Sequence, residues 1–153
     1  MKVGLALLAA LALNACAAPA RMQDKPMSPP APANPIAYVE IPVTDMVRAM
    51  AFYADVLGLD FERQTIDGYD MALFPAAEGT PGASGALVKG DVYVPGKTGP
   101  IVYFRVADID AVLKRARARG AKILYDKKDV GAFGFVAEVE DSEGNRIALN
   151  AAK

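Results

Sequence analysis

The sequence predicts an α+β fold in which a β-α-β-β-β unit occurs twice. A strand pattern followed by a helical pattern occupies residues 38–57, and a second such pair begins 63 residues later, at residue 101. Three further strand candidates follow each pair. When the two copies are aligned, the apolar positions of their leading strands coincide: Val39, Ile41 and Val43 fall on Val102, Phe104 and Val106. This alternation is typical of a strand with one face against a core.

The other positions of the leading strands carry polar and aromatic side chains. They are Tyr38, Glu40 and Pro42 in the first copy and Ile101, Tyr103 and Arg105 in the second. Because side chains alternate along a strand, this face must point away from the helices. A slip of one residue would bury Glu40 and Arg105 as unpaired charges, which is costly. The pattern leaves open whether the face is plainly solvated or forms the wall of a cleft.

The first copy, about residues 36–90, begins with a predicted strand at 36–43. Thr44 or Asp45 can cap the helix that follows, and Gly58 is well placed to end it. The remaining predicted elements are the helix at 46–57 and strands at 60–66, 69–75 and 85–89.

The second copy, about residues 100–150, repeats this order after a Pro- and Gly-containing connection at 92–99. Asp108 can cap its helix and Gly120 can close it. The predicted elements are the helix at 109–119, strands at 122–125, 133–140 and 146–150, and a turn at 141–145. In the strand 133–140, alternation predicts a core-facing set: Phe133, Phe135, Ala137 and Val139. Gly134, Val136 and Glu138 should then point the other way.

The first 15 residues are typical of a secretory signal. Lys2 precedes an apolar run of eleven residues at 3–13, which is too short to span a bilayer as a helix. The run leads into Leu13-Asn14-Ala15-Cys16, which resembles a bacterial lipobox. Lipidation of Cys16, the single cysteine, would anchor the chain to a membrane. The alternative is an ordinary signal cut at Ala15-Cys16-Ala17.

Residues 16–35 are predicted to be a tether, since six of the eleven prolines lie there and large apolar residues are nearly absent. The resemblance to Gram-negative lipoproteins, with Ala17 after the cysteine, implies the periplasmic leaflet of the outer membrane. The formal net charge is −1 and no basic run exceeds two residues, so nothing indicates a nucleic-acid partner.

Four segments, in order along residues 36–150, together resemble the vicinal oxygen chelate superfamily, which includes glyoxalase I, bleomycin-resistance proteins and extradiol dioxygenases. The segments are Glu40-Ile41-Pro42-Val43-Thr44-Asp45, Phe52-Tyr53-Ala54-Asp55-Val56-Leu57-Gly58, Tyr103-Phe104-Arg105-Val106-Ala107-Asp108-Ile109-Asp110 and Asp141-Ser142-Glu143-Gly144-Asn145-Arg146-Ile147-Ala148-Leu149. The resemblance implies one domain at 36–153, two modules whose sheets curl into an open U-shaped barrel around a ligand cleft, and a homodimer.

The same resemblance implies a divalent metal in the family's enzymes, held by His, Glu or Gln side chains of both modules. Here those positions carry Tyr38, Ile101 and Ala148, and the fourth lies near Ala86 or Leu87. The chain also contains no histidine. We therefore expect no metal and no other cofactor.

The candidate ligand-binding residues are those of the polar strand face together with two residues of the second copy: Tyr38, Glu40, Tyr103, Arg105, Glu138 and Lys128. Arg105 could pair with a ligand carboxylate or phosphate. Alternatively, Glu40 and Arg105 form an ion pair within the sheet, Glu138 is a solvated strand residue, and Lys127 and Lys128 belong to a solvated loop.

Three functions fit these observations. The first is a periplasmic, lipid-anchored protein that binds a small molecule without a metal. The second is a glyoxalase-like lyase or isomerase that uses Glu40 or Glu138 for acid–base chemistry, which requires a raised carboxylate pKa. The third is an envelope structural or interaction protein. Convergence of Glu40 and Glu138 in a closed pocket would favour the enzyme.

Overall fold

The computed structural model describes residues 36–76 and 82–153. The predicted signal, Cys16 and the tether lie outside the described residues. Within the described part, no helix combines the length and the apolar character that crossing a membrane requires.

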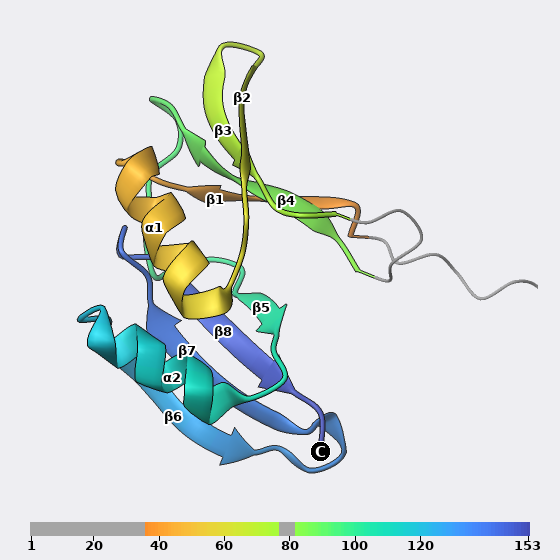
Figure 1. Cartoon of the computed structure of the whole chain (residues 1–153). Helices are drawn as coiled ribbons and strands as arrows, with labels where there is room; N and C mark the ends of the chain where they lie inside the picture. Colours follow the sequence, from red (N-terminus) through yellow and green to blue (C-terminus); the bar gives the residue numbers. More distant parts are fainter. Residues whose placement is uncertain (1–35, 77–81) are drawn as a thin grey trace, which may run out of the picture. The chain divides into compact units, whose positions relative to one another are not determined.

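The first module is a four-stranded mixed sheet with one helix (Figure 1). Its elements are β1 (Tyr38–Pro42), α1 (Met46–Leu57), β2 (Glu62–Ile66), β3 (Tyr69–Leu73) and β4 (Ser84–Lys89). The strand order is β1-β4-β3-β2, with β1 parallel to β4 and the other pairs antiparallel.

The second module repeats this topology. Its elements are β5 (Val102–Arg105), α2 (Ile109–Ala118), β6 (Ile123–Asp129), a 3₁₀ turn η1 (Gly131–Phe133), β7 (Phe135–Glu140) and β8 (Arg146–Ala151). The order β5-β8-β7-β6, with β5 parallel to β8, mirrors that of the first sheet. The predicted fold class, with its duplicated β-α-β-β-β unit, is therefore confirmed.

Both helices begin and end as the sequence indicates. The Asp45 side chain accepts a hydrogen bond from the Arg48 N–H at the start of α1, and Gly58 ends that helix in the left-handed region. Asp108 caps α2 in the same way, through the N–H groups of Asp110 and Ala111. These caps satisfy backbone donors that lack partners inside a helix.

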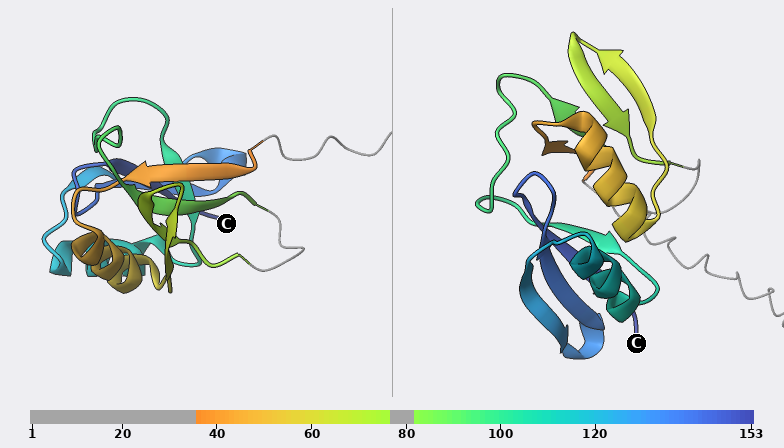
Figure 2. Two further views of the ribbon diagram at one scale, coloured as in Figure 1. Left: turned by 90° about the horizontal axis from the view of Figure 1, so that it is seen from above. Right: turned by 60° about the vertical axis from the view of Figure 1, so that its left-hand side comes forward.

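The main core lies between the helices and the faces of the two sheets that they cover. Its largest fully buried side chains are Tyr53, Leu87, Ile109, Ile147, Leu149, Val43, Val56 and Val139. Val88 is also fully buried but belongs to a second, smaller cluster. The two helices lie next to each other (Figure 2) and are in contact. Arg115 of α2 donates a hydrogen bond to the Val56 carbonyl of α1 at 2.9 Å. One continuous core therefore joins both modules.

Glu143, in the turn before β8, fastens the second module to the start of α1. Its side chain has no exposed surface. The carboxylate accepts hydrogen bonds from the N–H groups of Thr44 at 2.9 Å and Asp45 at 3.0 Å, and from Nε of Arg48 at 2.8 Å. Burial opposes ionisation, but the hydrogen bonds from Arg48, Thr44 and Asp45 outweigh it and lower the pKa of Glu143 to about 2.

Two further side chains of this turn complete the junction. Asp141 accepts a hydrogen bond from the buried Tyr53 hydroxyl at 2.7 Å, and Asn145 donates one to the Pro42 carbonyl at 2.8 Å. The turn thus contacts both β1 and α1 of the first module.

The structure differs from the sequence prediction around the β6–β7 connection. β6 extends to Asp129, so Lys127 and Lys128 lie in a strand rather than in a loop. The prediction that Phe133 faces the core is wrong, because Phe133 lies in the 3₁₀ turn and is 82% exposed. Gly134, with φ of +84°, then redirects the chain, and regular alternation begins only at Phe135.

Candidate functional site

The candidate site lies on the face of the first sheet that is turned away from α1, which we call the open face. Residues directly opposite one another on paired strands share a face. One row across the four strands therefore consists of Glu40, Ala86, Leu73 and Glu62. Two apolar side chains lie between two carboxylates in this row.

The centre of the open face is apolar although neither of the two described α-helices packs against it. Met71, Ala86 and Val88 are buried there and form a small cluster separate from the main core. The partly buried Tyr69, Leu73 and Tyr93 pack against this cluster. An apolar surface with a few polar groups at its margin is the usual form of a small-molecule site.

Tyr93 belongs to the connection between the modules and packs against the open face. Its hydroxyl donates a hydrogen bond to Glu40 Oε2 at 2.7 Å, and its ring meets the Tyr69 ring edge-on with centroids 5.2 Å apart. This hydrogen bond and the charge of Glu40 raise the pKa of Tyr93 to about 12. Tyr93 therefore remains a neutral donor at physiological pH.

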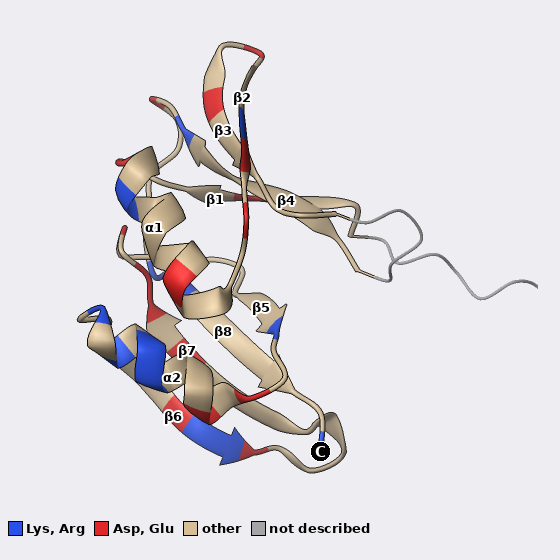
Figure 3. Cartoon of the chain, viewed as in Figure 1, with Lys and Arg blue, Asp and Glu red and all other residues tan. Residues whose placement is uncertain are grey.

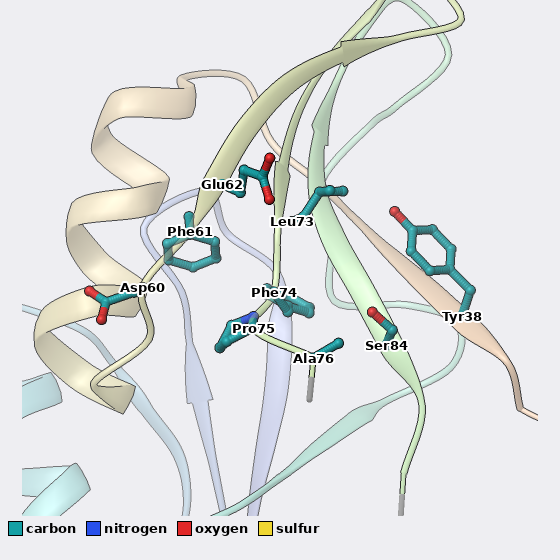
Figure 4. A pocket seen from close by; sticks show the side chains of 9 residues that line it. All are labelled: Tyr38, Asp60, Phe61, Glu62, Leu73, Phe74, Pro75, Ala76 and Ser84. Atoms are coloured by element: carbon teal, nitrogen blue, oxygen red, sulfur yellow. The ribbon is translucent and has the colours of Figure 1, made fainter. Parts of the chain in front are cut away.

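Two hollows border this surface, and both are lined by Tyr38 and Leu73. The larger, of about 820 Å³, lies at the end of the sheet where β2 begins and β3 ends (Figure 4). Its lining residues are Tyr38, Asp60, Phe61, Glu62, Leu73, Phe74, Pro75, Ala76 and Ser84. The smaller, of about 440 Å³, is lined by Tyr38, Glu40, Ile66, Asp67, Tyr69, Met71, Leu73 and Tyr93.

The second sheet has a corresponding face turned away from α2, with a different character. Tyr103, Ala148, Glu138 and Tyr125 form one row across it. Glu138 is buried and accepts a hydrogen bond from Arg146 Nε at 2.8 Å, and Nη2 of Arg146 lies 2.6 Å from the same carboxylate oxygen. Its carboxylate is thus held in an ion pair.

The remaining sequence candidates also lie in the second module. Arg105 lines a separate hollow beside α2, together with Leu57 and Arg115. The Lys128 ammonium lies 5.9 Å from the centre of the Tyr125 ring. Tyr103 is 53% exposed and lines neither hollow of the open face.

The structure therefore brings together two of the six candidates, Tyr38 and Glu40. Among the residues that the structure describes, no ion pair joins Glu40 to Arg105, and Glu40 and Glu138 line no common pocket. The sequence reasoning missed Tyr93, since a Pro- and Gly-containing connection has no periodicity that would place a side chain. It also missed Leu73 and Glu62, which alternation along their strands could have assigned to this face.

The side chains at the family's metal positions do not fit a divalent cation. Tyr38 and Ala86 lie on the open face, and Ala148 lies on the corresponding face of the second sheet. A neutral phenol and two methyl groups are not the imidazole and carboxylate donors that such metals take. Across residues 36–76 and 82–153, no group of three or more His, Cys, Asp or Glu side chains could hold a metal ion.

Comparison with known proteins identifies the family. The glyoxalase/bleomycin resistance protein/dioxygenase superfamily matches residues 35–149. A glyoxylase-like domain-containing protein of Didymella fabae is 32% identical over 121 residues, which cover 74% of this chain and 91% of that protein. The chain belongs to this superfamily, as the four sequence segments indicated.

Two solved structures from Streptomyces sp. CB03234 resemble the chain in both fold and sequence. One is TnmS3, an antibiotic binding protein, at 26% identity and a TM-score of 0.60, covering 77% of this chain and 95% of TnmS3. The other is a glyoxalase/bleomycin resistance protein at 28% identity and a TM-score of 0.60, covering 75% of this chain and 98% of that one. The solved structures similar to this chain thus include that of an antibiotic binding protein.

Proposed function

We propose that this protein binds a small molecule on the open face of the first sheet, and that the binding needs no metal. The observation that carries the proposal is the pair of hollows that border the open face, both lined by Tyr38 and Leu73, beside the buried apolar cluster of Met71, Ala86 and Val88. A flat apolar ligand that covered the partly exposed Tyr38 and Leu73 in these hollows would gain about 25 cal/mol for each Å² of apolar surface removed from water. Tyr38, Glu40 and Tyr93 at its margin would orient polar groups of the ligand.

The similarity to TnmS3, an antibiotic binding protein, supports binding without chemical change. The acid–base alternative fits less well, because Glu138 is paired with Arg146 on the other sheet and Glu40 accepts a hydrogen bond from Tyr93. Neither carboxylate is placed to act with the other on one substrate.

Absence of a metal is part of the proposal, and it rests on the residues at the family's ligand positions. Elemental analysis of the purified protein after dialysis should find far less than one equivalent of zinc, nickel, iron or manganese. About one equivalent of any of these metals would contradict it.

The proposal includes location and assembly. Lipidation of Cys16 would hold the domain at the periplasmic face of the outer membrane, and the sequence Leu13-Asn14-Ala15-Cys16 supports it. A homodimer is the assembly that the family resemblance implies. Sedimentation analysis tests it, and a monomer at all concentrations would refute it.

A thermal-shift screen of the purified protein against metabolites and antibiotics tests the binding function. A ligand specific to the folded state stabilises it by about 2.7 kcal/mol at a hundredfold excess over Kd. The shift should shrink in Tyr38→Ala, which removes a ring common to both hollows, and persist in Phe133→Ala, which removes an exposed ring outside them. Shifts lost equally in both variants, or no shift with any compound, would count against the proposal.

A further inference from the structure

The hollows of the open face are acidic, and the described residues that line them include no basic side chain. Four carboxylates line the two hollows: Glu40, Asp60, Glu62 and Asp67. The two hollows and the apolar side chains that line them define the site. The four carboxylates determine which charge on a ligand the site favours.

Most other carboxylates of the described chain are neutralised. Nine acidic residues take part in ion pairs: Asp45, Asp55, Asp70, Asp110, Asp126, Asp129, Glu138, Glu140 and Glu143. None of the described ion pairs includes a carboxylate that lines the open-face hollows. The negative charge of this surface is therefore uncompensated within the described part of the chain.

Strand alternation explains why the nearby cations do not neutralise it. Arg63 of β2 pairs with Asp70 at 2.7 Å, and Lys89 of β4 lies opposite Asp70, all on the α1 side of the sheet. In the second module, lysine and arginine gather on α2 and β6 (Figure 3). The basic side chains of β2 and β4 thus lie on the face opposite to Glu40 and Glu62.

The open face also offers aromatic surface. Tyr38 is 43% exposed, and Tyr69 and Tyr93 pack beside the same hollow. Tyrosine rings attract cations over their faces, by about 0.5–1 kcal/mol at exposed sites and more when the pair is desolvated. The carboxylates and the aromatic rings around this hollow therefore both favour a positively charged ligand.

We propose that the ligand of the open face is an organic cation: a protonated amine or quaternary ammonium group carried on a flat aromatic body. This inference rests on the proposed binding function and adds the chemical class of the ligand. The aromatic body would lie against Tyr38 and Leu73, which line both hollows, and its cationic group would face Glu40 or Glu62. These residues stand at opposite ends of a row of four strands, about 14 Å apart at strand spacing. Anionic ligands would be repelled.

Three acridines of like shape and different charge test this inference. At neutral pH, 9-aminoacridine is a cation, acridine is neutral and acridine-9-carboxylate is an anion. Fluorescence titration of the purified protein should give the highest affinity for 9-aminoacridine, and that affinity should fall with added salt.

Two site variants and a matched control locate the effect. Glu40→Gln and Glu62→Gln remove the two candidate partners one at a time. The variant that loses the partner of the cationic group should bind 9-aminoacridine about tenfold more weakly, the loss typical of one charge-assisted contact, and the other variant should show a smaller loss. Asp126→Asn removes the same charge from an exposed position on β6 and should leave the affinity within about twofold.

The outcomes separate the ligand class from the binding function. Equal affinity for all three acridines, or the highest affinity for the carboxylate, would overturn the inferred class while leaving binding at the open face intact. Failure of all three to bind would also overturn it, and the thermal-shift screen then decides whether the binding function fails as well. Equal losses in the control and in the site variants would show that overall charge alone governs affinity, and would refute the assignment.

Discussion

The buried carboxylate of Glu143 ties α1 of the first module to the turn before β8. Its partners are two backbone N–H groups, the Thr44 hydroxyl at 2.7 Å and the Arg48 guanidinium. Leaving such donors without an acceptor in a buried setting costs more than the hydrogen bonds themselves contribute. The hydrogen bonds of Glu143 therefore stabilise the contact between the two modules.

Replacing Glu143 by Gln should lower the free energy of unfolding at pH 7 by about 2–3 kcal/mol, because the pKa of Glu143 lies near 2 in the folded protein. The unfolded chain binds a proton at the normal glutamate pKa, above the folded value. The stabilisation is therefore complete above that normal pKa and disappears as pH falls towards 2. Urea denaturation at pH 7 and pH 3 measures both effects.

Asp91→Asn, at an exposed position, is the control for the Glu143 variant. Asp91→Asn should leave the pH dependence of the free energy of unfolding the same as in the wild-type protein. If Glu143→Gln and wild type lost stability in parallel between pH 7 and pH 3, the assigned role of Glu143 would be wrong.

At the scale of elements, alternation decides which side chains reach the site, and turns decide where alternation begins. The positions of Tyr38 and Glu40 on the open face follow from the apolar set Val39, Ile41 and Val43, of which Ile41 and Val43 are buried. The same reasoning failed at Phe133, because the glycine-flanked 3₁₀ turn delays β7 by two residues. Sequence periodicity carries no information about such a turn.

Tyr93 illustrates a second reason why the site was only partly predictable. It lies in an irregular connection, and its hydrogen bond to Glu40 joins residues 53 positions apart in the chain. That contact depends on how the connection passes over the sheet. Local patterns of polarity do not encode this path.

Gly134 holds the β6–β7 turn in a conformation that is essentially limited to glycine, with φ of +84° and ψ of −136°. A Cβ atom there would lie 2.1 Å from the Ala151 carbonyl oxygen. We expect Gly134→Ala to cost about 3 kcal/mol or more in urea denaturation, because strain and a backbone clash add together. Gly120→Ala, at φ of +75° with open space around the position, should cost only about 1 kcal/mol. Similar costs for the two variants would contradict this account of the turn.

For the whole molecule, the duplicated module provides one core and two sheet faces of different character. The first sheet presents an apolar and acidic surface, whereas the second presents Tyr103, Tyr125 and an ion pair of Glu138 with Arg146. The family's fold is retained, whereas Tyr38, Ala86 and Ala148, at positions where the family resemblance implies metal ligands, carry no imidazole or carboxylate. Binding is the role that remains most compatible with this combination.

The anchoring proposal predicts that the mature protein fractionates with membranes. Cys16→Ser should release it into the soluble periplasmic fraction or leave its signal uncleaved, because the thioether-linked lipid can no longer form. Fractionation with mass spectrometry of the N-terminus measures this. Wild-type protein that is fully soluble with an unmodified N-terminus would contradict the anchor.

The most direct test of the central claim is to map the binding surface with the tightest ligand from the screen. Backbone amide NMR shifts of the purified protein should change on β1, β3 and β4 and at Tyr93 as ligand is added. The same titration of Tyr38→Ala should require more ligand for equal changes. Shift changes confined to the second sheet or to the helices, with β1, β3 and β4 unaffected, would contradict the assignment of the open face as the binding site.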